Sequence, residues 1–214
     1  LAKDELLLTL VDNSFSLIKQ VRTGLTSFPI DLDKAKGHLA TATLIQLAIK
    51  PDIVHVVSYS EANHAARPED IIESCNIVDQ VINASFASKL NFINKKIRKR
   101  KEELIKEAQW IINLIPRLAK TYEEQKSPWI NHKVLNRLVE YGIFDAPHLK
   151  NNKFALGQIK TKVINGACYS WDINHQRKID ERERINKIIE KYPNLLMPED
   201  KLQKELFYGK VMNE

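Results

Sequence analysis

Three polar side chains that could contact a ligand, Tyr59, Glu61 and Asn63, follow directly after a short β-branched run. The run spans residues 53–57 and predicts a strand buried on both faces of a parallel sheet. Ligand sites in α/β proteins form where the loops at the carboxyl ends of such strands converge. These residues are therefore candidates for a binding site. The alternative interpretation is a solvated loop, because glutamates are mostly exposed.

The histidines and cysteines give no sign of a metal centre. His55 lies within the apolar run and is expected to be a core imidazole, whereas His64 lacks the helical HExxH context of a zinc site. The two cysteines, Cys75 and Cys168, have no metal-ligand spacing, and we expect both to be buried thiols in a reducing compartment. The sequence thus predicts no metal and a cytoplasmic location.

Strands and helices alternate around the candidate loop. Residues 15–22 predict a strand before the first helix, which Asp31 or Asp33 can cap, and Pro68 opens a second helix after the loop. The expected buried positions are Ala35, Leu39, Ala42, Ile45 and Ile49 in the first helix and Ile71, Cys75, Val78 and Ile82 in the second. Parallel neighbours need crossover helices of this length, so the order predicts two consecutive parallel β/α units.

The pattern changes beyond residue 89. A long helix is predicted for residues 91–125, with Pro116 as a kink, and a charged helix for residues 176–191. Between these two helices, beyond Pro128, a short helix is predicted to end at Tyr141-Gly142, and an irregular stretch rich in asparagine, lysine and glycine follows it. We therefore divide the chain into partial barrel units (1–89), a long helix (90–126) and a helical and irregular extension (127–214).

Composition fits a chain with a sizeable core of its own. Of 214 residues, 43% are hydrophobic and 28% are charged, and no apolar run reaches the roughly 18 residues of a membrane span. A complete eight-unit barrel needs about 250 residues. Because the chain also opens at Leu1 rather than at a methionine, we expect a first half of the fold to be missing upstream.

A net charge of +6 would suit an anionic partner. Much of the excess lies in residues 95–101, but on a helix these charges spread around the circumference and Glu102 and Glu103 follow, which favours a solvated helix. A nucleic-acid-binding helix is the competing interpretation, although no RNP, KH or zinc-finger pattern supports it. The dispersed tryptophans, Trp110, Trp129 and Trp171, are expected to be core or interface anchors.

Three segments carry a family resemblance in collinear order. They are Phe28-Pro29-x-Asp31-x-x-Lys34-Ala35-x-Gly37-x-x-x-Thr41-Ala42-Thr43-x-Ile45, then Ser60-Glu61-Ala62, and Gly142-Ile143-Phe144-Asp145-Ala146-Pro147. Over residues 15–172 the chain resembles the C-terminal half of the large component of coenzyme B12-dependent glutamate mutase (methylaspartate mutase). The resemblance implies an α/β fold: the C-terminal portion of a TIM-like (β/α)8 barrel with parallel strands, followed by a mainly helical extension.

The resemblance also implies a radical isomerase. Such a mutase uses adenosylcobalamin to rearrange a carbon skeleton, as in the conversion of L-glutamate to 3-methylaspartate. Glu61 is similar to a family glutamate that hydrogen-bonds the ribose of the adenosyl group, and Tyr59 and Asn63 would contact the same nucleoside. Arg22 aligns with a family histidine and would face a small acidic substrate. The family's cobalamin is held by a separate small subunit through a D-x-H-x-x-G loop, which this chain lacks, so a cobalamin-binding partner or missing domain is implied.

Two departures bear on activity. Val57 stands where the family has a lysine, and Arg22 stands where it has a histidine. The family's clamping arginines and glutamate base lie on strands absent from this chain, so we expect no catalytic residue here and a divergent relative that is inactive alone. The alternatives are a non-catalytic, barrel-derived assembly or regulatory module and, less favoured, a basic nucleic-acid-binding domain. A homo-oligomer stays open.

Overall fold

The structure, a computed structural model, describes residues 1–23, 27–88 and 93–198. The chain divides into two compact units, an N-terminal unit (Leu1–Lys99) and a C-terminal unit (Arg100–Glu214). Helix dominates, with 54% of the residues helical. No helix in the described ranges is both long and apolar enough to cross a membrane.

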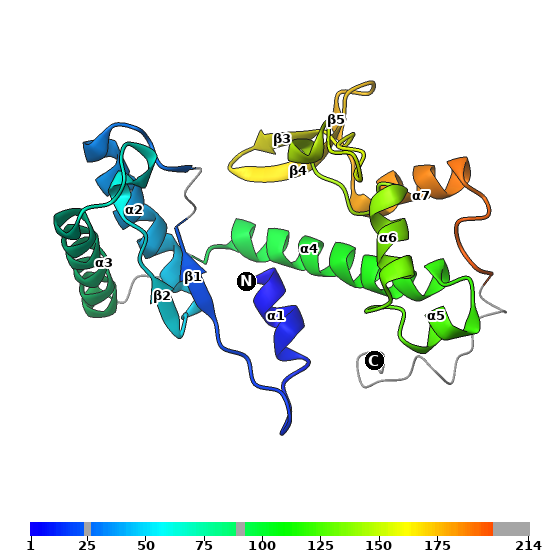
Figure 1. The fold of residues 1–214 in the computed structure, drawn as a ribbon, viewed down its shortest axis with the longest axis horizontal. Helices are drawn as coiled ribbons and strands as arrows, with labels where there is room; N and C mark the ends of the chain where they lie inside the picture. The colour runs from blue at the N-terminus through cyan, green and yellow to red at the C-terminus, as the bar shows by residue number, and fades with distance from the viewer. Residues whose placement is uncertain (24–26, 89–92, 199–214) are drawn as a thin grey trace. The chain divides into compact units, whose positions relative to one another are not determined.

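The N-terminal unit is built on two parallel strands and two principal helices (Figure 1). Its elements are α1 (Ala2–Leu8), β1 (Gln20–Arg22), α2 (Leu32–Gln46), η2 (Leu47–Ile49), β2 (Ile53–His55), η3 (Tyr59–Ala62) and α3 (Pro68–Ser88). Strands β1 and β2 pair with Val21 opposite Val54. Asp31 caps α2, since its carboxylate accepts the backbone N–H of Lys34 at 2.9 Å, as the sequence predicts.

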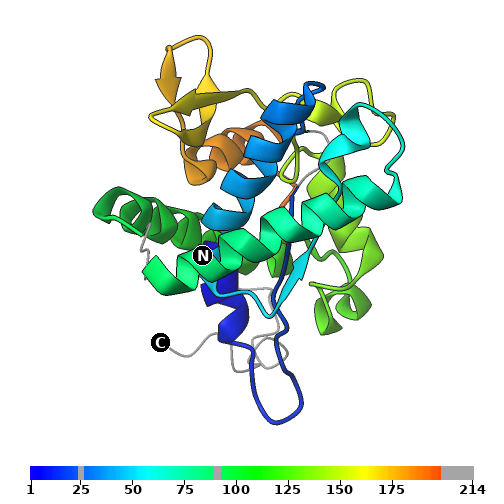
Figure 2. The same ribbon diagram turned by 90° about the vertical axis from the view of Figure 1, so that its left-hand side faces the viewer.

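The core of the N-terminal unit lies on one side of the two strands. Helices α2 and α3 pack side by side there (Figure 2) and enclose Ala35, Leu39, Val57 and Val78. The other side of β2 is open, with Ile53 47% exposed. The prediction of a strand buried on both faces is therefore wrong, as is that of a core imidazole at His55, which is exposed.

The buried stripe of α3 agrees only in part with the predicted one, since Val78 is buried and Ile82 packs against the core as predicted. Ser74 and Val78 are its buried residues, whereas Ile71 is 49% exposed and Cys75 is exposed. Ser74, a polar residue that the apolar pattern does not count, faces inward and donates its hydroxyl to the carbonyl of Asp70. Cys168 is exposed as well, so the expectation of two buried thiols is wrong.

The C-terminal unit combines helices with a small antiparallel sheet (Figure 1). Its elements are α4 (Lys95–Leu114, which begins just before the division), η4 (Ile115–Leu118), α5 (Tyr122–Lys126), α6 (His132–Glu140), η5 (Pro147–Leu149), β3 (Thr161–Ile164), β4 (Ala167–Asp172), β5 (Arg177–Lys178) and α7 (Glu181–Lys191). The sheet order is β3-β4-β5. Asn165 and Gly166, both with positive φ, form the two-residue turn of the β3–β4 hairpin.

The long helix predicted for residues 91–125 is shorter. Helix α4 ends at Leu114, because Pro116 has no N–H to continue the ladder and the chain tightens into η4 before turning at Ala119. Residues 89–92 lie outside the described part of the chain. The predicted end of α6 at Tyr141-Gly142 is confirmed, with Gly142 at φ +74°.

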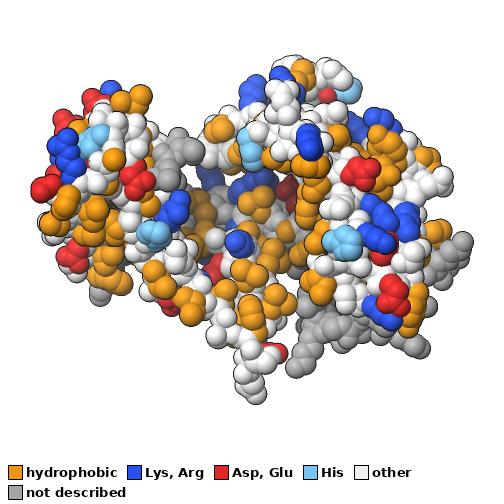
Figure 3. Space-filling view, viewed as in Figure 1, with side chains coloured by type: hydrophobic (Ala, Val, Ile, Leu, Met, Phe, Trp, Pro, Cys, Tyr) orange, Lys and Arg blue, Asp and Glu red, His pale blue; other side chains and the backbone are white. Residues whose placement is uncertain are grey.

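The core of the C-terminal unit forms where α4, η4, α6 and α7 meet. Its fully buried members include Leu118, Val134, Leu138 and Ile185. Hydrophobic side chains also remain at the surface of both units (Figure 3). The most exposed are Ile18, Ile30 and Phe86 in the N-terminal unit and Ile130, Phe154 and Val163 in the C-terminal unit.

The predicted barrel portion is not present. The described residues hold one two-stranded parallel sheet and one three-stranded antiparallel sheet, whereas a (β/α) barrel portion would continue parallel strands beyond β2. The physical reason lies after α3, where the chain forms the helix α4 and an antiparallel hairpin in place of further crossover units.

Candidate functional site

The loop between β2 and α3 lies at the carboxyl edge of the parallel pair. Because β1 and β2 run in the same direction, with Arg22 opposite His55, the ends of both strands meet at one edge. The Ser58 hydroxyl accepts the backbone N–H of Ser60 and caps η3. Ser60 is fully buried. The Ser58 cap and the buried Ser60 thus fix the loop against the interior of the N-terminal unit.

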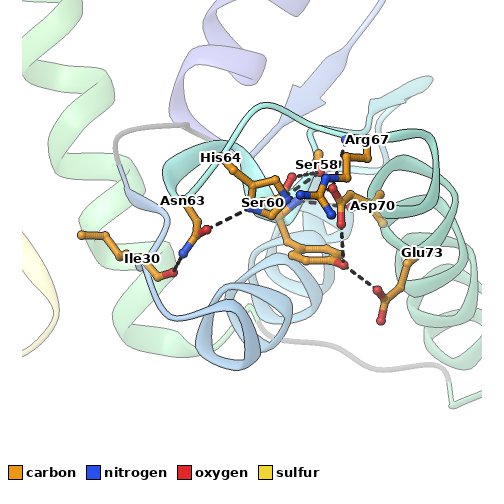
Figure 4. Close-up of polar contacts among 10 residues, drawn as sticks. Ile30, Ser58, Ser60, Asn63, His64, Arg67, Asp70 and Glu73 are labelled. Carbon is orange, nitrogen blue, oxygen red and sulfur yellow. Dashed lines mark hydrogen bonds and ion pairs between the residues drawn. The ribbon is translucent and has the colours of Figure 1, made fainter.

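Tyr59 is part of the internal structure of the loop. The side chain is only 4% exposed, and its hydroxyl lies 2.5 Å from Glu73 Oε2 and 3.2 Å from Asp70 Oδ1 (Figure 4). Lys36 Nζ lies 4.8 Å from the ring centroid and 2.7 Å from Glu73 Oε1. The hydrogen bond to Glu73, with burial next, raises the pKa of the Tyr59 phenol far above its ordinary value. The phenol therefore stays neutral and hydrogen-bonded to the two carboxylates.

Asp70 organises the start of α3. Its Oδ2 accepts the backbone N–H of Arg67 at 3.0 Å and lies 3.0 Å from His64 Nε2 (Figure 4). The hydrogen bond from Arg67 is the main cause that holds the pKa of Asp70 below its usual value, with further lowering by His64 and Tyr59. The negative charge of Asp70 is also favourable here, because the N-terminus of a helix carries a partial positive charge. His64 serves this capping arrangement.

Asn63 ties the loop to the segment before α2. Its Nδ2 donates to the carbonyl of Ile30 at 2.9 Å, and its Oδ1 lies 2.9 Å from His64 Nδ1 (Figure 4). Both ends of the amide are therefore used within the protein. The structure gives Asn63 and Tyr59 structural roles, where the sequence predicted contacts to a nucleoside.

Glu61 and Arg22 are the two predicted site residues that remain available. Both side chains are exposed, and within the described ranges neither makes a side-chain hydrogen bond or ion pair. The backbone carbonyl of Arg22 accepts Gln46 Nε2 at 3.0 Å, which fixes the strand end without using the guanidinium. An acceptor-only carboxylate and a planar five-donor cation are thus presented at the same edge.

Glu61 and Arg22 give this edge two exposed charged groups that can bind a ligand. Val57, at the start of the loop, is buried and carries no charge. Among the described residues, no group of three or more histidines, cysteines or carboxylates could hold a metal. The edge can therefore accept hydroxyl donors at Glu61 and pair an anion at Arg22.

A cavity of about 480 Å³ in the C-terminal unit is a feature that the sequence reasoning missed. Ile143, Asp145, Glu181 and Arg184 are among its lining residues. The Arg184 guanidinium donates to the carbonyls of Gly142 and Ile143 and to Glu181. The carboxylate of Asp145 accepts three backbone N–H groups, from Gly157, Gln158 and Ile159. Asp145 and Arg184 of this cavity are thus already hydrogen-bonded to other parts of the C-terminal unit.

A comparison of the chain with known protein families and with curated proteins finds no match to either.

Proposed function

We propose that the chain is a component of an adenosylcobalamin-dependent carbon-skeleton mutase, in which the N-terminal unit contacts the adenosyl group and the chain does not catalyse turnover by itself. The observation that carries the proposal is the free carboxylate of Glu61 at the carboxyl edge of a parallel strand pair, between Tyr59 and Asn63, whose polar groups are hydrogen-bonded within the protein. The resemblance to the glutamate mutase large component supports this assignment of class.

The residues present fit the nucleoside part of the cofactor. A ribose offers two neighbouring hydroxyl donors, and a carboxylate with no internal partner can accept both. When bound, adenosylcobalamin supplies the radical chemistry. Arg22 would pair with the carboxylate of a small acidic substrate such as L-glutamate, because its guanidinium matches a carboxylate bidentately.

The corrin requires a partner. The sequence has no D-x-H-x-x-G loop, so a small cobalamin-binding subunit or domain is part of the proposal. Val57 stands where the resembled family has a lysine that serves the adenosine and substrate region, so the edge lacks that positive charge. A regulatory or assembly module, the alternative, would have no affinity for a nucleoside.

Calorimetric titration of the whole chain with 5′-deoxyadenosine, and separately with adenosylcobalamin, tests the proposal. Glu61→Gln should weaken binding of both about tenfold, because a charged hydrogen bond is worth about 1.5 kcal/mol. Arg22→Gln should leave nucleoside binding intact and abolish binding of L-glutamate. No heat with either ligand, or equal affinities for the chain and Glu61→Gln, would contradict the proposal and favour the assembly module.

Tyr59→Phe is the matched control for that titration. The variant removes the hydroxyl that bonds Glu73 and Asp70, so the free energy of unfolding should fall by about 1–3 kcal/mol. Nucleoside affinity should not change, since Tyr59 is buried. A weakened nucleoside affinity with an unchanged free energy of unfolding would instead indicate that Tyr59 contacts the nucleoside.

A further inference from the structure

Alternate residues of the antiparallel sheet place lysines and aromatic rings on the same face. Lys162 pairs with Tyr169 in the β3–β4 register, and Trp171 pairs with Lys178 in the β4–β5 register. Paired residues project to the same face, and residues two apart on one strand do so too. Lys160 lies opposite Trp171 on this face, because the backbone N–H of Trp171 donates to the backbone carbonyl of Lys160 at 2.8 Å.

Cations lie directly over the two rings. Lys162 Nζ is 4.2 Å from the centroid of Trp171. Lys178 Nζ and Arg100 Cζ lie 5.1 Å and 4.3 Å from the centroid of Tyr169. We name this set the basic-aromatic strip. Its members, all in the C-terminal unit, are Arg100, Lys160, Lys162, Tyr169, Trp171 and Lys178.

The positive charge of the strip is carried by its lysines. Arg100 is already paired, at 3.1 Å from Glu103 and 4.0 Å from Glu107, and donates to the carbonyl of Cys168. The three lysines are exposed, and no ion pair engages them within the part of the chain that the structure describes. The acid of the sheet, Asp172, alternates to the opposite face, where it pairs with Lys187.

We propose that the basic-aromatic strip binds single-stranded nucleic acid, with phosphates at the three lysines and bases against Trp171 and Tyr169. Lysine ammonium groups neutralise phosphates, and aromatic rings accept the exposed face of a base whatever its sequence. A lysine held only over a ring can move to a phosphate and leave the ring to a base. This function goes beyond the proposed one, because it uses neither Glu61 nor the N-terminal unit.

Single-stranded nucleic acid suits the strip better than duplex nucleic acid or an anionic membrane does. The bases of a duplex are stacked and cannot reach a ring. An anionic membrane would need exposed apolar side chains for insertion, whereas the apolar members of this face, Ile164 and Ala167, are partly buried. The exposed Val163 lies on the opposite face of the hairpin.

Fluorescence anisotropy of a labelled oligothymidine of about 12 nucleotides, titrated with the full chain across salt concentrations, tests the inference. A triple variant carries Lys160→Ala, Lys162→Ala and Lys178→Ala. Its matched control carries Lys34→Ala, Lys106→Ala and Lys133→Ala, three exposed lysines on α2, α4 and α6. Both variants lose the same formal charge.

The expected result separates the two variants. Loss of three phosphate contacts should reduce the slope of log K against log salt by about 2, which corresponds to about a hundredfold weaker binding at 0.1 M salt. The control should keep most of the affinity. Trp171→Phe should remove the quenching of tryptophan fluorescence that the oligonucleotide causes, with circular dichroism confirming that the fold is retained.

Several outcomes would overturn the inference. They are no binding at low salt, equal losses in the triple variant and its control, equal affinity for a duplex of the same length, and binding to phosphatidylserine vesicles without binding to the oligothymidine. None of these outcomes bears on nucleoside binding at Glu61, so failure here and failure of the proposed function are separable.

Discussion

Buried charge in the C-terminal unit is paired at Glu124 and Arg137. Glu124 is 4% exposed, and its two carboxylate oxygens lie 2.5 and 3.1 Å from the guanidinium nitrogens of Arg137. The backbone N–H of Lys120 donates to the same carboxylate. The hydrogen bond from Arg137 is the main cause that lowers the pKa of Glu124. The pair therefore fastens α5 to α6.

Glu124→Ala should lower the free energy of unfolding by about 3 kcal/mol, because it leaves Arg137 without its counter-charge in a mostly buried place. Since the folded pKa of Glu124 is depressed, its contribution is complete above the unfolded value of 4.5 and is lost as pH falls through the folded pKa. Urea denaturation across pH should show the gap between the chain and the variant shrinking in acid.

Glu123→Ala is the control for that series. Glu123 is 74% exposed and pairs with Lys126 at the surface, so its removal should cost about 0–1 kcal/mol. A pH-independent gap for Glu124→Ala, or equal costs for the two variants, would contradict the account of the pair.

At the same scale, the sequence predicts some roles and misses others. The exposure of Glu61 follows from its type and loop position. The hydrogen bonds of Tyr59 do not follow from the sequence, because its partners Asp70 and Glu73 lie 11 and 14 residues later, in α3, and only packing brings them together. Neighbouring residues in one loop thus have different roles, for reasons that no local pattern carries.

Among the elements, the β3–β4 hairpin carries a local turn signal in its sequence. Asn165-Gly166 is a strong two-residue turn sequence, and residues on both sides alternate in type. The asparagine, lysine and glycine that are frequent in this stretch favour an irregular structure, and the prediction of an irregular stretch is wrong for the hairpin. The sequence correctly predicts the start of α2 and the end of α6, since the Asp31 cap and the Gly142 terminus are local effects, but Ile45 of α2, expected to be buried, is 59% exposed.

Gly157 fixes the approach of the segment before β3 to η5. It has φ +58°, and an added Cβ would lie 2.2 Å from the backbone nitrogen of Lys150. Gly157→Ala should therefore cost more than about 3 kcal/mol, because backbone atoms must move. Thermal unfolding followed by circular dichroism measures the loss.

Gly166→Ala provides the comparison. Gly166 has φ +81°, yet nothing lies within 4 Å of an added Cβ, so only the backbone conformation is penalised, by about 1–2 kcal/mol. Similar losses for the two variants would mean that the close approach at Lys150 does not constrain the fold.

At the scale of the whole molecule, the two units have separate cores. Leu39 is 1% exposed within the N-terminal core, and Leu138 is fully buried within the C-terminal core. Sequence reasoning failed most at this scale. The sequence correctly predicts the order strand, helix, strand, helix of the N-terminal unit. The prediction of a barrel is wrong, because a barrel requires long-range strand pairing that local patterns do not specify.

Leu39→Ala and Leu138→Ala should each destabilise one unit by about 2–5 kcal/mol. All three tryptophans lie in the C-terminal unit, so tryptophan fluorescence should report the loss for Leu138→Ala alone, whereas circular dichroism should report both. A single transition that both substitutions shift equally would contradict the independence of the cores.

The two free cysteines are exposed, with Cys75 in the N-terminal unit and Cys168 in the C-terminal unit. Maleimide dyes can therefore be attached to the natural chain, one in each unit, without engineering any new thiol. Single-molecule energy transfer between these dyes would give the distribution of distances between the units in solution. Adding an adenosyl compound or an oligonucleotide to the same labelled sample would show whether either ligand changes that distribution.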